Sequence, residues 1–403
     1  MYISQFLLLS FDALLLVCGL GLLIPCLVLF AECMAALFPP SEENSKGNIQ
    51  NAKVAVLVPA HNEELIIRST LMDLKVKLQN KYQLLVVADN CSDATAEIAR
   101  RVGATVIERN DVNNLGKGYA LDYGLRFLEQ EPPEVVVFMD ADCFVQQGSI
   151  EKLAELAITK KRPVQATYLM SKPALSSPKD SVSAFAFKVK NQVRLLGLKQ
   201  LRLPCTLVGT GMAFPWSAIS SVNLASGDIV EDMKLGLDLN ISGYPPLFCP
   251  HATVIGCLPQ QTQAAVSQRT RWEHGHLQTL LTYVPKLIEA SVKQKRIDLL
   301  GSALDLSVPP LSLLVTIWLL LMIASLFVAL MGINHSAILI GAIGYLLMLT
   351  ILTAWFNFGR KELTLLQLLS IPIYIVNKIP VYLQFIFKPV KVWVRTERDS
   401  VNP

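Results

Sequence analysis

Long apolar runs near both ends of the chain enclose a middle region in which short apolar runs alternate with polar segments. The first run extends from Phe6 to Phe38 and is interrupted by only three polar residues, Ser10, Asp12 and Glu32. Such a run is long enough for one tilted membrane-spanning helix of roughly 20 to 25 residues. It is too long for the apolar part of a cleaved signal peptide and no basic segment precedes it, so we expect a membrane anchor.

Two more apolar runs, Ser307 to Met331 and Ala337 to Phe356, each have the length of a spanning helix. The uncharged residues 332–336 between them leave room only for a turn, which predicts a helical hairpin. The last apolar stretch, Leu363 to Phe387, is interrupted by Pro372, Asn377, Lys378 and Pro380. These interruptions favour an interfacial or re-entrant segment over a straight spanning helix.

Basic residues flank the apolar runs in a pattern that indicates their orientation. They are Lys46 and Lys53 after the first run, Lys286, Lys293, Lys295 and Arg296 before the second, Arg360 and Lys361 after the third, and Lys388, Lys391, Arg395 and Arg398 in the tail. Because the cytoplasmic ends of membrane segments accumulate Lys and Arg, all of these belong on one side. The pattern therefore predicts a cytosolic middle region and tail, with residues 332–336 outside.

The middle region has the pattern of an α/β domain. Its predicted strands are the apolar runs 54–58, 83–88, 104–107 and 135–139, and its first predicted helices lie at 62–77 and 92–101. Continuous apolar runs are typical of strands buried on both faces, and their alternation with helices predicts a parallel sheet. Ligands bind at the carboxyl ends of such strands, so polar residues there are candidates for function.

Composition supports the membrane assignment and argues against one class of partner. Hydrophobic residues make up 52% of the 403, and the mean hydropathy of +0.43 exceeds that of an ordinary soluble protein. The 36 Lys and Arg against 32 Asp and Glu leave a net charge of +4, which does not favour nucleic-acid binding. The eight cysteines form no CxxC pair and have no histidine at zinc-ligand spacing, so we expect them to be reduced.

Aspartates follow two of the predicted strands. Asp140 and Asp142 come directly after the strand at 135–139. Carboxylate oxygens at that position suit Mg²⁺ or Mn²⁺, which would offset the charge of nucleotide phosphates, although the pair alone also fits a solvated loop. Asp89 ends another strand and is placed to accept hydrogen bonds from a base or ribose, whereas Asp93 has the position of a helix-capping residue.

Two more candidates lie after strand-like segments. Glu63 follows the first strand, where its carboxylate would face a nucleotide. Lys117 lies between Gly116 and Gly118, which let the backbone come close to a ligand. The spacing excludes a Walker phosphate loop.

Later motifs complete a set that resembles a known family. Gly209-Thr210-Gly211, Glu231-Asp232 and Gln268-Arg-Thr-Arg-Trp272 follow in that order. With them the chain resembles the inverting glycosyltransferases of family 2, particularly the membrane group that includes cellulose, chitin and hyaluronan synthases and ceramide glucosyltransferase. The family pattern is an Asp, an Asp-x-Asp, a later Asp and Gln-x-x-Arg-Trp, matched here by Asp89, Asp140 with Asp142, Asp232, and Gln268 with Arg271 and Trp272.

The resemblance implies a GT-A fold, which is an α/β domain with a Rossmann-like mixed sheet, and direct displacement on a nucleotide-sugar donor, expected to be a UDP-sugar. Asp232 would be the general base, although it also fits a helix N-terminal carboxylate, and Arg271 would offset diphosphate charge. Donor-binding candidates are Asp89, Glu63, Lys117, Asp140 and Gln268. Acceptor-binding candidates are Gly209, Thr210, Gly211, Glu231 and Trp272.

The expected organisation is a membrane helix at 1–40, a cytosolic glycosyltransferase domain at 50–280, two membrane helices at 303–357, and an interfacial or re-entrant segment with a basic tail at 363–403. Within the domain, stretches near 181–203 and 263–280 are expected to be helices at the membrane surface. In the first, basic residues supply charge for the headgroup region: Lys188, Lys190, Arg194, Lys199 and Arg202.

The product of the reaction stays open at this stage. In processive synthases the polymer leaves through a channel of transmembrane helices. Three predicted spanning helices are too few to form such a channel alone, so a homo-oligomer or an accessory membrane subunit would have to complete it. The alternative acceptor is a lipid that receives a single sugar. We favour polysaccharide synthesis, and we place a catalytically silent membrane scaffold and a transporter behind both, since every motif carboxylate is present and the spans hold few charges.

Overall fold

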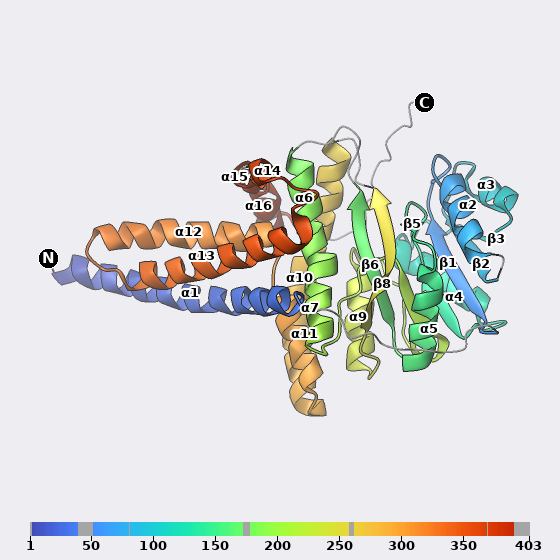
Figure 1. The fold of residues 1–403 in the computed structure, drawn as a ribbon, viewed down its shortest axis with the longest axis horizontal. Helices are drawn as coiled ribbons and strands as arrows, with labels where there is room; N and C mark the ends of the chain where they lie inside the picture. The colour runs from blue at the N-terminus through green and yellow to red at the C-terminus, as the bar shows by residue number, and fades with distance from the viewer. Residues whose placement is uncertain are drawn as a thin grey trace.

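The computed structural model describes residues 2–38, 51–79, 81–171, 178–257, 262–368 and 370–390. Three long helices project as a bundle from one end of an α/β domain, and further helices lie between the bundle and the sheet (Figure 1). Of the basic residues used to orient the chain, Lys46, Lys391, Arg395 and Arg398 lie outside the described residues.

The domain contains an eight-stranded sheet with the order β3-β2-β1-β4-β7-β6-β8-β5. The strands are β1 (Val54–Ala60), β2 (Gln83–Asp89), β3 (Thr105–Arg109), β4 (Val135–Phe138), β5 (Phe144–Val145), β6 (Val164–Ser171), β7 (Met212–Pro215) and β8 (Leu247–Cys257). The first four strands are parallel, as predicted. The sheet as a whole is mixed, as the family resemblance implied, because β7 runs antiparallel to both β4 and β6, and β5 runs antiparallel to β8. The sheet is therefore the mixed one of a GT-A fold.

Helices cover both faces of this sheet, because the strands carry apolar side chains on both. The helices are α2 (Ile67–Leu78), α3 (Thr95–Val102), α4 (Lys117–Leu128), α5 (Ser149–Lys160), α8 (Trp216–Ile219) and α9 (Glu231–Ile241). One apolar core joins α2, α3 and α5 to one face of the strands, and a second joins α4, α8 and α9 to the opposite face. Burial of each large aliphatic side chain contributes roughly 1.5–3 kcal/mol to folding.

The first two helices of the domain begin later than predicted. Helix α2 begins at Ile67, because Asn62 has a left-handed φ of 54° and the backbone amide of Glu63 donates to Thr95 Oγ1 at 2.7 Å instead of entering a helix. Helix α3 begins at Thr95, whose amide and hydroxyl both donate to Asp93 Oδ1. Asp93 therefore has the capping role expected from its position.

The bundle consists of α1 (Tyr2–Ala35), α12 (Leu311–Leu330) and α13 (His335–Ala354), the last of which continues as a π-helical turn at Trp355–Gly359. Each has the length and apolar character needed to cross a membrane. Helix α12 begins after Pro310, so Ser307 ends the preceding helix, α11 (Ile297–Ser307), rather than starting the span as predicted. Asp12 of α1 accepts hydrogen bonds from the backbone and hydroxyl of Ser336, which fixes α1 against the start of α13.

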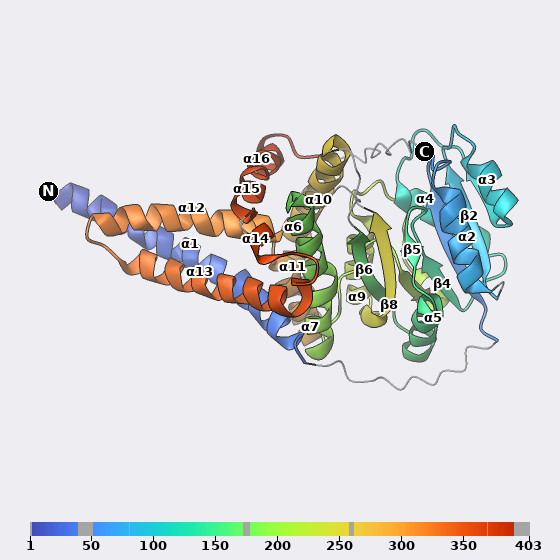
Figure 2. The same cartoon turned by 45° about the horizontal axis from the view of Figure 1, so that its top comes forward.

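The last apolar stretch contains three short helices, α14 (Leu365–Leu368), α15 (Ile371–Val376) and α16 (Ile379–Phe387). By length and composition it is a fourth candidate span. In the fold, these helices lie beside the domain end of the bundle, near α6 (Pro178–Lys188) and α10 (Thr262–Gln294) (Figures 1 and 2). An interfacial or re-entrant position for the segment is a proposal that this arrangement supports.

The helices between bundle and sheet are α6 (Pro178–Lys188), a π-helical turn (Val189–Val193), α7 (Arg194–Gln200), α10 (Thr262–Gln294) and α11. The first three form one continuous helix, which we call the roof helix, where the sequence predicts an amphipathic helix at 181–203. One part of that prediction was wrong. Lys190 and Arg194 line an internal cavity instead of supplying charge to lipid headgroups. All eight cysteines, each within the described residues, are free thiols as expected.

Candidate active site

A cavity of about 360 Å³ lies between the carboxyl ends of the strands and the helices next to the bundle. It gathers most of the residues singled out from the sequence: Glu63, Asp89, Lys117, Asp140, Asp142, Gly209, Glu231, Asp232, Gln268, Arg271 and Trp272. Thr210 and Gly211 do not line it, and Thr210 is fully buried. The topology thus brings together side chains from segments that lie far apart in the sequence.

Asp140 lies just past β4 and is fixed on two sides. Its backbone amide donates to Thr210 Oγ1 at 3.1 Å, which explains why Thr210 lies behind the cavity wall. Its carboxylate forms an ion pair with Lys117, the first residue of α4, and Lys117 Nζ also donates to Gly209 O at 2.6 Å. Burial alone would lower the pKa of Lys117, but the carboxylates of Asp140, Glu231 and Asp232 outweigh burial and raise it.

Asp140, Asp142 and Cys143 each offer a ligand atom within 4.8 Å of the others. Carboxylate oxygens are hard ligands of the kind that Mg²⁺ and Mn²⁺ prefer. Cys143 does not fit such an ion, because burial and the nearby carboxylates raise the pKa of its thiol well above the usual range and keep it protonated. The residues present therefore fit a divalent cation held by the two aspartates, without the cysteine.

Glu231 and Asp232 occupy the first turn of α9 and face the same cavity. Gly209 approaches them closely, since a Cβ added there would lie 3.2 Å from Asp232 Oδ2 and its φ of +96° disfavours other residues. Burial raises the pKa of Asp232, which the positive charges of Lys117 and Lys190 oppose. Burial likewise raises the pKa of Glu231 to about 7, partly offset by Lys117.

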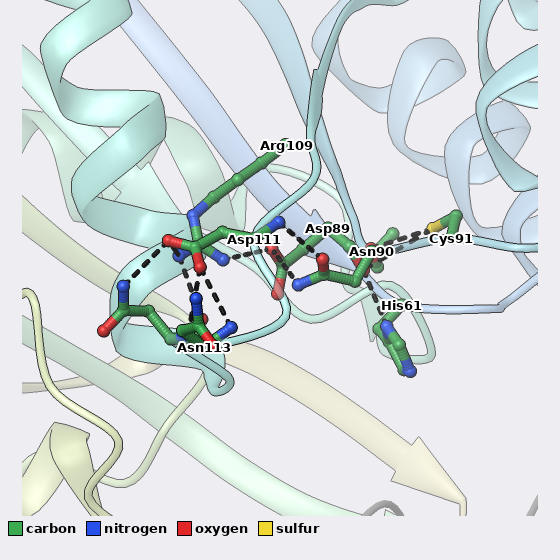
Figure 3. Close-up of polar contacts among 9 residues, drawn as sticks. His61, Asp89, Asn90, Cys91, Arg109, Asp111 and Asn113 are labelled. Atoms are coloured by element: carbon green, nitrogen blue, oxygen red, sulfur yellow. Dashed lines mark hydrogen bonds and ion pairs between the residues drawn. The ribbon is translucent and has the colours of Figure 1, made fainter.

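Asp89 is held by Arg109, a residue that the sequence reasoning missed (Figure 3). Arg109 Nη1 donates to Asp89 Oδ1 at 2.7 Å, and both side chains are buried. Arg109 also donates to Asp111 Oδ2 at 3.1 Å and to the carbonyl of Asn114 at 2.9 Å. The sequence feature that could have identified Arg109 is its position just after the apolar run of β3. The strand continues to Arg109, which pairs with Asp89 of β2 in the parallel ladder. Asp89 is thus fixed in position at the edge of the cavity.

Three aromatic rings line the other side of the cavity. Tyr168 meets Phe187 edge to face at 5.1 Å between ring centroids, and Phe187 lies 5.9 Å from Trp272. Only Trp272 was predicted, because Tyr168 and Phe187 lie in segments without a recognisable motif. Flat apolar rings of this kind stack on the faces of sugars. Gln268 is buried next to them, and its Oε1 has no hydrogen-bond partner among the described residues.

Beyond Trp272 the cavity continues to the membrane bundle. Its wall there includes Leu29 of α1, residues 308–312 at the start of α12, and Tyr374 and Lys378 from the last apolar stretch. Lys378 forms an ion pair with Glu273 of α10, next to Trp272. One continuous space therefore joins the strand-end carboxylates to the helices suited to a membrane.

Comparisons with known proteins agree with this geometry. Residues 51–275 match the family model described as "Glycosyltransferase like family 2". The chain is 27% identical over 289 residues to the probable glycosyltransferase YdaM of Bacillus subtilis, covering 64% of this chain and 62% of that protein. It is 24% identical over 252 residues to the poly-beta-1,6-N-acetyl-D-glucosamine synthase of Staphylococcus aureus, covering 57% and 55%. The matches thus span a little over half the length of these two relatives.

Among solved structures, the mannosyltransferase PcManGT of Pyrobaculum calidifontis, in complex with GDP-Man and Mn²⁺, superposes with a TM-score of 0.57 at 17% identity. The superposition covers 95% of this chain and 100% of that one, which shows a shared GT-A fold. The family model covers more than half of the chain and includes every motif residue described above. The chain therefore belongs to glycosyltransferase family 2.

Proposed function

We propose that this glycosyltransferase moves a sugar, with inversion at the anomeric carbon, from a nucleotide-sugar donor to an acceptor at the membrane surface. The donor is a UDP-sugar and the acceptor a growing cell-surface or extracellular polysaccharide. One observation carries the proposal: Asp232 faces the same cavity as the Asp140 and Asp142 pair and the ring of Trp272. A base, a diphosphate site and a sugar-stacking surface around one space are the parts that such a transfer requires.

On the donor side, Asp89 accepts hydrogen bonds from the nucleoside and Glu63 lines the same region, while Gln268 faces the donor from beside the aromatic rings. Asp140 and Asp142 hold Mg²⁺ or Mn²⁺, which supplies positive charge against the donor diphosphate. Lys117 and Arg271 add cationic groups to the same cavity. Together these residues bind the donor and offset the charge that builds on the leaving nucleotide.

On the acceptor side, Asp232 takes the proton of the attacking hydroxyl. The new bond forms between that oxygen and the anomeric carbon as the bond to the diphosphate breaks on the opposite face. Positioned general bases of this kind contribute about 10²- to 10⁴-fold to rate. Trp272 stacks on the acceptor ring, with Gly209 and Glu231 beside it.

The acceptor is where two versions of the function differ. The resemblance to polysaccharide synthases, one of which is among the relatives, supports a growing glycan. The extension of the cavity to Leu29 and the start of α12 supports a second candidate, the transfer of one sugar to a lipid. In both versions the domain lies on the cytosolic side and the three bundle helices cross the bilayer, with a second copy or an accessory membrane subunit completing a channel if the product is a polymer.

The test uses the full chain in nanodiscs, a panel of labelled nucleotide sugars and Mn²⁺ or Mg²⁺, with nucleotide release and product size scored together. We expect release with one donor and a large glycosidase-sensitive product. Asp232→Asn should lose transfer at least 100-fold, the lower end of the usual contribution of a general base, while it still binds the donor. Normal turnover by this variant would show that Asp232 is not the general base. A single sugar on an extractable lipid would establish the lipid version instead.

A further inference from the structure

The roof helix presents one face to the cavity along most of its length. Lys190 and Asn191, within the π-helical turn at Val189–Val193, and then Arg194 lie on the cavity wall. With Ser183, Ala186 and Phe187 these residues follow the i, i+3, i+4, i+7, i+8 spacing of one helix face. π-helical turns occur frequently at functional sites. This face brings the cationic side chains of Lys190 and Arg194 to the acceptor side of Asp232.

Other cations on this side of the cavity have anionic partners. Arg194 pairs with Glu32 at 2.6 Å and with Asp305 at 2.5 Å. Lys378 pairs with Glu273. Their charges are therefore already compensated within the protein.

Lys190 differs from these residues. It forms no ion pair or hydrogen bond with any residue in the part of the chain that the structure describes. Its nearest charges act in both directions, since Asp232, Asp305 and Glu273 attract the ammonium while Arg194 repels it. Burial nevertheless lowers the pKa of Lys190. The ammonium is thus a partly desolvated charge without a direct partner.

His276 lies next to this cation and offers it no compensation. Burial and the positive charges of Lys190 and Arg194 lower the pKa of His276 well below its usual range, so the imidazole is neutral. A small recess beyond the main cavity is lined by Lys190, Arg194, Thr206, His276 and Asp305 together with neighbouring apolar side chains, and Asp305 is already paired with Arg194. An ordered anion placed against Lys190 would give its ammonium the direct partner that it lacks among the described residues.

We infer that Lys190 is the centre of an oxyanion subsite on the acceptor side of the cavity, and that the acceptor carries a phosphate group beside its reacting hydroxyl. The inference rests on the proposed transfer reaction for its placement on the acceptor side. A lysine binds phosphate as a compact point charge with three rotatable donors, which suits a group whose orientation varies along a flexible acceptor. Because the cavity reaches the bundle helices, the phosphate belongs either to a lipid headgroup or to a free sugar phosphate.

The experiment measures binding of inorganic phosphate by calorimetry to the full chain in a polyoxyethylene detergent, which has neither phosphate nor sugar. Saturating UDP and Mn²⁺ fill the donor site, so phosphate can report only on another one. Lys190→Gln should weaken phosphate binding about tenfold or more, the loss expected for one charge-assisted hydrogen bond. Lys190→Arg should stay within a few-fold of the wild type.

The matched control is Lys199→Gln, on the same roof helix but away from the cavity, which should bind phosphate as the wild type does. Equal melting temperatures of the variants separate a lost contact from a misfolded protein. No phosphate binding by the wild type, or equal binding by Lys190→Gln, would overturn the inference. The assay does not require turnover. Phosphate binding at Lys190 can therefore be confirmed even if the proposed transfer reaction is wrong, and the transfer reaction can be confirmed even if no phosphate binds.

A second arm identifies the source of the phosphate. A lipid monophosphate in mixed micelles and glucose 1-phosphate in solution are each titrated against bound inorganic phosphate. Displacement by the lipid alone places the group on a membrane-borne acceptor, and displacement by the sugar phosphate places it on a soluble one. Displacement by neither, or equally by an uncharged sugar, would show that no acceptor phosphate reaches Lys190 and would overturn the inference.

Discussion

Arg194 of the roof helix and Glu32 of α1 form an ion pair of 2.6 Å although 162 residues separate them in the sequence. Both side chains are buried, and Asp305 of α11 accepts a second bond from the same guanidinium at 2.5 Å. Thr206 Oγ1 completes the set by donating to Asp305 Oδ2 at 2.7 Å. One guanidinium therefore links the membrane bundle, the roof of the cavity and the helix that leads into α12.

Arg194→Met should destabilise the protein strongly, because it leaves Glu32 and Asp305 buried without their cation. Breaking a buried pair in this way typically costs about 3–5 kcal/mol. Thermal unfolding of the full chain in nanodiscs measures the change. Lys188→Met is the control, since its partner Glu362 is half exposed and such pairs contribute about 0–1 kcal/mol. Equal melting temperatures for the two variants would contradict the importance of the buried pair.

Gly197→Ala should disturb the same junction without changing any charge. A Cβ at Gly197 would lie 2.0 Å from the carbonyl oxygen of Glu32, a backbone atom that cannot move aside as a side chain does. We expect a lower melting temperature and a loss of nucleotide release, because α7 must move away from α1. Gly21→Ala is the matched control in α1, where an added Cβ meets nothing within 4 Å. If the Gly197 variant were as stable and active as the Gly21 variant, α7 and α1 would be able to move apart without loss of stability or activity.

Asp140→Ala and Asp142→Ala should each weaken metal-dependent binding of the donor. With one hard ligand removed, we expect about a tenfold or greater rise in the Mn²⁺ concentration needed for half-maximal binding, the range seen when groups that support a metal are lost. Titration of Mn²⁺ at fixed nucleotide sugar measures this. Asp122→Asn, whose carboxylate pairs with Arg126 on α4, is the control. Donor binding that persists unchanged in chelator would show that the aspartates serve another purpose.

Glu231 should make the metal-free protein less stable as pH rises. Its pKa is raised to about 7 in the fold from an ordinary value of 4.5, so between these values the folded state binds a proton that the unfolded state has lost. Its contribution to stability is therefore fully present below pH 4.5 and is lost as pH rises through 7. At pH 8, Glu231→Gln should exceed the wild type in stability by up to roughly 3 kcal/mol.

The measurement for Glu231 is chemical unfolding in chelator from pH 4.5 to 8, with Glu97→Gln as a control on an exposed carboxylate that pairs with Arg101. The free energy of unfolding of the Glu97 variant should depend on pH as that of the wild type does. For the Glu231 variant, the decrease in this free energy with rising pH should be smaller. Parallel curves for the wild type and the Glu231 variant would mean that this carboxyl stays ionised in the fold.

The carboxylates at the strand ends could be predicted from sequence because the relevant information is local. Asp89 and Asp140 each end an apolar run, and parallel strands end at one edge of a sheet, so the two had to lie close together. The antiparallel strand β7 was missed because its pairing with β4 depends on segments more than seventy residues apart. Strand pairing of this kind is decided by packing rather than by local propensity.

The ion-pair partners of buried charged side chains also could not be predicted from neighbouring residues in the sequence. Arg194 has the spacing of a residue on the polar face of an amphipathic helix, and nothing near it in the sequence indicates Glu32 or Asp305. Arg109 follows a short apolar run like any exposed strand-end arginine, yet the ladder between β2 and β3 places it on Asp89. In both cases a buried cation is identified only when its distant carboxylate is located.

The ion pair between α1 and the roof helix also connects the cavity to a helix that is suited to cross the bilayer. A spanning helix tilts when the hydrocarbon layer becomes thinner or thicker than its apolar length. Because Arg194 binds α1 and lines the catalytic cavity, a change in tilt reaches the cavity wall through one rigid connection. We therefore expect lipid chain length to change the width of the proposed acceptor site, and turnover to depend on the thickness of the host membrane.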